Sequence, residues 1–182
     1  MKSILLKSQT ECQLAIGSYP IFLYDARGGG GEANLLSSNT KNNLHYKFDS
    51  ETFSIPPLNS KTTKFLGMPL PPGLQIKMFM NKLEGTIDFQ TGEVIFDFNA
   101  SFEFSICRLI KFPNLIINTI LGTRRVKSRL FDVSGQVLQK DKQTTLVGIA
   151  MIERTNNWIL DSFLKLPNEA LAVLKCQIIG LD

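Results

Sequence analysis

Four cationic side chains stand close together in the sequence, at a spacing that suits the binding of an anion. They are Arg124, Arg125, Lys127 and Arg129. Because successive side chains of a β-strand point to opposite faces, the alternation of the last three would place three positive charges on one face. This basic strand is a candidate contact for a phosphate, an acidic lipid head group, the propionate of a pigment or an acidic protein. A solvated strand face is the plainer interpretation.

The basic strand is expected to form one arm of a hairpin, residues 123–133 with 136–140, that turns at Ser134-Gly135. A tight turn there would set Arg129 opposite Lys140. Like charges directly opposite each other destabilise a sheet. Two alternatives therefore stay open: a bulge shifts the register, or the charges are retained for an anionic partner.

Few residues of this chain suit catalysis or metal binding. His45 is the sole histidine, so neither a His-based triad nor a His-rich metal site can be assembled. Asp88, Asp97 and Glu103 fall on the polar face of predicted strands, where solvated surface explains them. The three cysteines lie far apart without CxxC spacing, which favours reduced thiols. We therefore expect no catalytic residue, no metal, and no cofactor other than a lipid or pigment held without a covalent bond.

The composition argues against several classes of protein. A formal net charge of +4 over 182 residues is small for a nucleic-acid partner, and no stacking aromatics interleave the basic residues. No segment approaches the ~20 apolar residues of a transmembrane segment. The apolar run near Met1 stops after three residues, too soon for a signal peptide. We expect a protein of the cytoplasm or of the soluble phase of an organelle.

Four consecutive glycines lie within residues 27–32. A phosphate-binding loop would need a GxxxxGK[ST] pattern, or GxGxxG before a helix, and neither is present. Because ordering glycine costs conformational entropy, the run predicts a mobile loop unless something binds it.

The clearest signal of architecture is an alternation of apolar and polar residues over 93–106. The apolar positions are Val94, Phe96, Phe98, Ala100, Phe102, Phe104 and Ile106. No helix has this period of two, so the stretch predicts a long strand with one face for a core and the other mostly for water. Parallel strands are buried on both faces, so the pattern indicates an antiparallel sheet.

Residues 82–89 are predicted to pair with this long strand through a tight turn at Thr91-Gly92. That register sets Gly85 opposite Phe98, where the missing side chain leaves room for a large ring. A four-residue turn would keep the same faces.

One helix is expected, over residues 156–166. Thr155 or Asn156 can cap it, and Pro167 ends it. The predicted apolar stripe consists of Ile159, Phe163 and Leu166. Residues 168–174 are expected to add a helical turn before a last strand.

Together these elements predict an all-β fold with one short C-terminal helix. Roughly eight to ten strands in a single domain over residues 1–182 suit an antiparallel β-barrel or a strongly curled sheet, which also removes exposed edges. In this pattern the chain resembles lipocalin-like barrels, and the resemblance implies a sheet closed around an interior.

Two non-enzymatic functions follow, and an enzyme working with a few carboxylates and an apolar pocket is the third hypothesis. In the first, the interior holds an apolar or amphipathic small molecule, a lipid or a pigment, with the basic strand at the mouth. The predicted pocket residues are Met78, Ile87, Phe89, Phe96, Phe98, Phe102 and Phe104. In the second, side chains fill the interior, and an accessory or assembly factor docks onto a protein complex through the basic strand, the proline-rich residues 66–73 or the glycine run.

Overall fold

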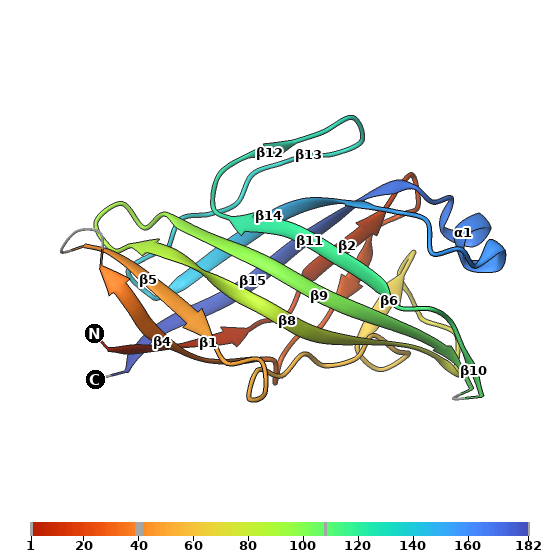
Figure 1. The fold of residues 1–182 in the computed structure, drawn as a ribbon, viewed down its shortest axis with the longest axis horizontal. Helices are drawn as coiled ribbons and strands as arrows, with labels where there is room; N and C mark the ends of the chain where they lie inside the picture. The colour runs from red at the N-terminus through yellow and green to blue at the C-terminus, as the bar shows by residue number, and fades with distance from the viewer. Residues whose placement is uncertain (1, 39–41, 108, 182) are drawn as a thin grey trace.

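The alternating stretch forms the long strand β9 (Val94–Ile106) of an antiparallel sheet (Figure 1). The computed structural model describes residues 2–38, 42–107 and 109–181. The other elements are β1 (Ser3–Ser8), β2 (Cys12–Ile16), β3 (Phe22–Tyr24), β4 (Gly30–Ser38), β5 (Asn43–Phe48), β6 (Thr63–Phe65), β7 (Met68–Pro69), β8 (Leu74–Asp88), β10 (Ile110–Lys111), β11 (Leu115–Gly122), β12 (Val126–Lys127), β13 (Asp132–Val133), β14 (Gln143–Ile152), α1 (Trp158–Leu164) and β15 (Asn168–Leu181). Among the described residues, no helix is long and apolar enough to cross a membrane.

Hydrogen bonds connect eight strands into a closed ring. The order is β1, β4, β5, β8, β9, β11, β14, β15 and back to β1, and neighbouring strands are antiparallel. The sheet is strongly curled without being an evenly rounded barrel (Figure 1). The predicted fold class, antiparallel all-β with one short helix, is confirmed.

The ring closes through β15, because both edges of this strand are hydrogen-bonded. On one edge it pairs with β14 from Asn168 to Gln177. On the other edge its first half pairs with β2 and its second half with β1. The prediction of a helical turn at residues 168–174 is therefore wrong: pairing on both edges outweighs the helix propensity of this Ala- and Leu-rich segment.

The second half of the glycine run is strand and takes part in the ring closure, so the expectation of a loop over residues 27–32 is wrong from Gly30 onward. Gly30 begins β4 and lies opposite Lys7 of β1. Its φ is +121°, and a Cβ atom there would lie 1.9 Å from the carbonyl oxygen of Leu6. Backbone bonds of 2.8 Å in both directions join it to Ser54. The run therefore lets β1 and β4 approach closely.

The predicted register of β8 against β9 is wrong by two residues, although the faces are right. Gly85 lies opposite Phe96, not Phe98, and Ile87 lies opposite Val94. The turn is longer than the tight turn expected, and the carboxylate of Asp88 accepts the backbone N–H of Gln90 at 2.8 Å. Because side chains alternate with a period of two, a two-residue shift preserves the inward face.

The strand β11 was not predicted, because its alternation is hidden. It pairs with β9 along its whole length. Leu115 and Ile117 are buried inside, whereas Ile116 and Ile120 point outward and are exposed. When both faces carry aliphatic residues, the period of two cannot be read from hydrophobicity.

Side chains from the strands of the ring form a buried central cluster. Tyr46, Phe48, Phe96 and Leu146 belong to the central cluster, and none is more than 2% exposed. The ring of Phe96 meets that of Phe48 edge to face, with 5.5 Å between centroids. A second cluster lies under α1 and a third beneath β3 and β6.

Gly30→Ala is expected to lower the free energy of unfolding by about 1–3 kcal/mol, because the methyl group would collide with the Leu6 carbonyl in a backbone conformation that suits glycine. Urea unfolding measures the loss. Gly28→Ala is the matched control: its φ is +85°, but no atom lies within 4 Å of the added carbon. Equal losses from the two substitutions would contradict the close-approach explanation.

Candidate functional site

The residues predicted to line a ligand pocket are distributed over three packed clusters. Ile87 and Phe96 are fully buried in the central cluster. Phe89 and Phe98 pack against that cluster, Phe102 and Phe104 against the cluster under α1, and Met78 against the third cluster. The inward direction of the phenylalanines in β9 therefore agrees with the alternation, and their rings pack against protein side chains.

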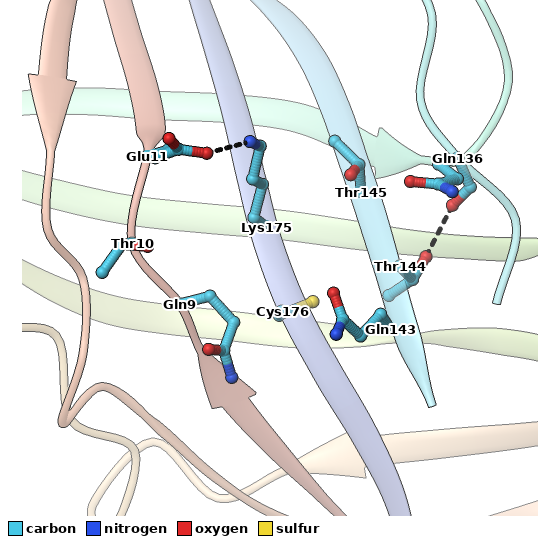
Figure 2. Close-up of a pocket in the computed structure, with 9 residues that line it drawn as sticks. All are labelled: Gln9, Thr10, Glu11, Gln136, Gln143, Thr144, Thr145, Lys175 and Cys176. Atoms are coloured by element: carbon cyan, nitrogen blue, oxygen red, sulfur yellow. Dashed lines mark hydrogen bonds and ion pairs between the residues drawn. The ribbon is translucent and has the colours of Figure 1, made fainter. Parts of the chain in front are cut away.

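Two hollows of the described surface lie away from these phenylalanines. One, of about 240 Å³, opens where β1 ends and β2 begins (Figure 2). Its polar groups largely satisfy one another: Lys175 pairs with Glu11 at 2.6 Å, and the Thr144 hydroxyl donates to the Gln136 carbonyl at 2.7 Å. The other hollow, of about 460 Å³, runs along β1 and the glycine run. No phenylalanine lines either hollow.

The basic residues lie on a small hairpin that stands outside the ring, β12 with β13 (Figure 1). The chain turns at residues 128–131, where the Ser128 N–H donates to the Phe131 carbonyl at 2.8 Å. The prediction of a turn at Ser134-Gly135 is wrong: Gly135 packs so closely that a Cβ atom would lie 2.6 Å from the Thr145 carbonyl oxygen. Lys127 faces Asp132, so the predicted like-charge conflict is absent.

Carboxylates of the same chain hold two of the four basic residues. Arg125 donates to Asp132 through Nε at 2.6 Å, and Arg124 forms an ion pair with Glu93. Hydrogen bonding to these carboxylates raises the pKa of each guanidinium. Anion contact through the four residues stays a prediction.

The alternation of charges in this hairpin has a packing explanation. Val126 and Val133 pack against the outer face of the sheet, beside Val147 of β14 and Leu171 of β15. Because alternate side chains of β12 face the sheet, Arg125 and Lys127 are turned toward water.

The helix α1 closes one end of the ring with a face different from the one predicted. Leu160 and Leu164 are 3% and 4% exposed and join the cluster that includes Leu115 and Ile152. The predicted stripe is wrong, because Ile159 and Phe163 point outward. Leu166 is buried but follows the helix. The helix thus has two apolar faces, one packed and one exposed, and periodicity could not choose between them.

Hydrogen bonds fix the start of α1. The Asn157 side chain accepts the Leu160 N–H at 3.0 Å, as an N-cap does. Asp161 accepts the N–H and the hydroxyl of Thr155 at 2.8 and 2.6 Å. These bonds to Thr155 hold the pKa of the Asp161 carboxyl below its usual value. The cap is therefore Asn157, one residue after the latest position predicted.

Several exposed apolar side chains belong to elements at the end of the ring where α1 lies, which we call the apolar end. They are Leu66, Met68, Leu109, Ile110, Trp158 and Phe163. Trp158 is 77% and Leu109 86% exposed. The residues come from the β6–β7 hairpin, from β10 and the residue before it, and from α1, and the proline-rich residues 69–73 follow Met68 in the chain. Figure 1 shows α1, β6 and β10 at this end, whereas Ser3 and Leu181 pair at the opposite one.

Antiparallel pairing explains why segments distant in sequence meet there. Phe22 lies opposite Phe65, so β2, β3 and β6 bring their turns to one end. Leu74 lies opposite Ile106, which brings the start of β8 and the end of β9 to the same end. The apolar end is thus a product of the sheet register, and sequence reasoning missed it because its residues lie in three separate segments.

The other side chains that could take part in catalysis or metal binding lie apart from one another. His45 lies on β5, and its Nε2 atom is buried without a hydrogen-bond partner among the residues that the structure describes. Burial raises the pKa of the Cys12 and Cys176 thiols, which favours their neutral form. Within the described ranges, no three His, Cys, Asp or Glu side chains gather in a way that could hold a metal ion.

No family model, curated protein or solved structure matches this chain.

Asn157→Ala is expected to fray α1 at a cost of about 1 kcal/mol, because the Leu160 N–H loses its acceptor. Hydrogen exchange of the α1 amides measures the change. Asn156→Ala is not a clean control, since Asn156 has a φ of +64°. Ser162→Ala, on the exposed side of the helix, is the control. Unchanged protection in Asn157→Ala would contradict the assigned cap.

The Asp161 carboxyl is expected to titrate below its usual pKa of 3.8, because its ionised form accepts both bonds from Thr155. A lowered folded pKa means that this contribution to stability is present above the unfolded value and is lost as pH falls through the folded one. The amide shift of Thr155, followed by NMR, measures the midpoint. The Asp161→Asn variant should lack this transition. A midpoint at or above the usual value would refute the assignment.

Proposed function

We propose that this protein is a non-catalytic accessory protein whose apolar end docks onto a larger partner. The observation that carries the proposal is the exposure of several large apolar side chains at one end of the ring, away from its buried central cluster. Singly exposed apolar residues are normal on a soluble protein, whereas several large ones at one end indicate an interaction site. A buried cluster of packed side chains also needs no bound molecule for its stability.

The two faces of α1 support docking over a role in closure alone. Leu160 and Leu164 suffice to pack the helix onto the ring. Trp158 and Phe163 leave large apolar areas in water, and each square ångström so exposed forgoes about 25 cal/mol of burial energy. A partner that covers these side chains would recover that free energy.

The basic strand is a weaker docking candidate than the apolar end. Arg124 and Arg125 are engaged by Glu93 and Asp132, so an anionic partner would have to compete with carboxylates already in place. Lys127 and Arg129 remain exposed.

A barrel that holds a lipid or pigment stays a prediction and is the second candidate function. Phe98, Phe102 and Phe104, which face inward and are only partly buried, favour it. In the described part of the chain, however, the two hollows are lined by polar or backbone-rich segments instead.

Native mass spectrometry of tagged protein purified from its own source separates the two functions. Docking predicts that the wild type is recovered in a high-mass or membrane-associated fraction and that Leu109→Asp shifts it to the 20.4 kDa monomer. Ile120→Asp, at an exposed residue in the middle of β11, should behave like the wild type. A small bound mass that survives in Leu109→Asp would instead support the container. A bare monomer for the wild type would contradict both.

A further inference from the structure

We propose that the partner of the apolar end is the surface of an anionic lipid bilayer. This inference rests on the docking function proposed above and deepens it by naming the chemistry of the partner. Three features of the end carry it: the side chains project from separate tips, a tryptophan stands among them, and the exposed charges beside them are mainly cationic.

The exposed side chains form protruding tips. Leu66 precedes Gly67 at the β6–β7 turn, Leu109 immediately precedes β10, and Trp158 begins α1. The β6–β7 hairpin, β10 and α1 lie outside the eight-stranded ring, at one end of the molecule (Figure 1). Separate apolar tips can each enter a deformable acyl layer, whereas a rigid protein partner would need a matching pocket for each one.

The identity of the most exposed aromatic residue suits the boundary between head groups and acyl chains. Trp158 is 77% exposed, and Phe163, which is also exposed, lies near the other end of α1. Indole rings combine a large apolar area with one N–H donor, and for that reason they concentrate at membrane–water interfaces. Leu109, at 86% exposure, supplies an aliphatic anchor on the neighbouring tip.

Cations are in excess among the exposed charges beside the tips. In the described residues of this end, the exposed cations are Lys64, Lys111, Arg154 and Lys165, and the exposed carboxylate is Glu153. Two further carboxylates of this end are partly buried and keep their negative charge: Glu103 lies 3.7 Å from Lys111, and Asp161 accepts hydrogen bonds from Thr155. Counted together over the described part of this end, four cations stand against three carboxylates, and the cations are the more exposed of the two. Basic side chains close to an anionic leaflet are attracted by its negative surface potential.

The same charges disfavour a second copy of this chain as the partner. In a two-fold contact through the apolar end, each protomer presents the same surface to the other. Such a contact would bring together the exposed cations Lys64, Lys111 and Lys165 of both protomers, with Glu153 as the one exposed carboxylate that each described end supplies. The anionic head groups of a bilayer can pair with all of these cations at once.

Trp158 is the sole tryptophan of the chain, so its fluorescence reports on the proposed surface directly. The probe is a vesicle of phosphatidylcholine with or without phosphatidylglycerol. Vesicles with phosphatidylglycerol are expected to shift Trp158 emission to the blue, and lipids with spin labels on the acyl chains are expected to quench it. Pure phosphatidylcholine vesicles should bind much more weakly. No response to either vesicle, or an equal response to both, would overturn the assignment.

Two sets of variants test the apolar and the electrostatic parts, with folding checked by thermal melts. Leu109→Asp should abolish the response, and Ile120→Asp, exposed at mid-strand, should preserve it. Lys111→Glu combined with Lys165→Glu should weaken binding by roughly fivefold or more for each cation replaced. Lys127→Glu, on the hairpin outside the ring, is the matched charge control and should leave binding unchanged. The reverse pattern would place the contact on the basic strand and overturn the inference.

Failure of the lipid inference can be told from failure of the docking function. If vesicles give no response but Leu109→Asp still releases a protein partner from protein purified from its source, the bilayer is wrong and docking stands. If Leu109→Asp changes neither readout, the apolar end is not a docking surface, and both proposals fall.

Discussion

The fold depends on hydrogen bonding along both edges of β15. One edge pairs with β14, and the other edge pairs with β1 and β2. Because β14 and β1 are otherwise the two ends of the sheet, β15 closes the sheet into a ring. A strand with a free edge would expose its backbone groups and invite association with other chains. Closing the ring also fixes α1, which immediately precedes β15, at one end of the sheet.

Close backbone approach makes the closure possible on the other side of β1. Gly30 sits against the Leu6 carbonyl, where any side chain would collide. Once the ring is closed, its inward face is filled by aromatic and aliphatic residues from nearly every strand, with Phe96 and Tyr46 completely buried. The end of the ring is sealed by Leu160 and Leu164 of α1. Packing thus uses one face of the helix and leaves the other in water.

Charge is distributed by the same geometry. The basic hairpin lies outside the ring, and there Arg124 forms an ion pair with Glu93 and Arg125 with Asp132. At the apolar end, Lys64 and Lys165 have no such carboxylate among the described ion pairs, although Lys165 lies 5.6 Å from the centre of the Tyr19 ring. The surface that combines exposed apolar residues with free cations is therefore the end closed by α1, and the proposed function follows from that combination.

Local periodicity alone predicts the sheet type and the inward face of β9 as far as Phe104, because a period of two is a local property of a strand. It is wrong for the last two residues, where Ser105 is buried and Ile106 exposed. The sequence also located the helix before Pro167. Three features depend on neighbours distant in sequence and could be found only in the folded chain. They are the buried face of α1, the strand at residues 168–174, and the close approach of Gly30 to β1 that closes the ring. The apolar end belongs to this second group: no local pattern relates Leu66, Leu109 and Trp158, and they meet because antiparallel registers bring their turns together.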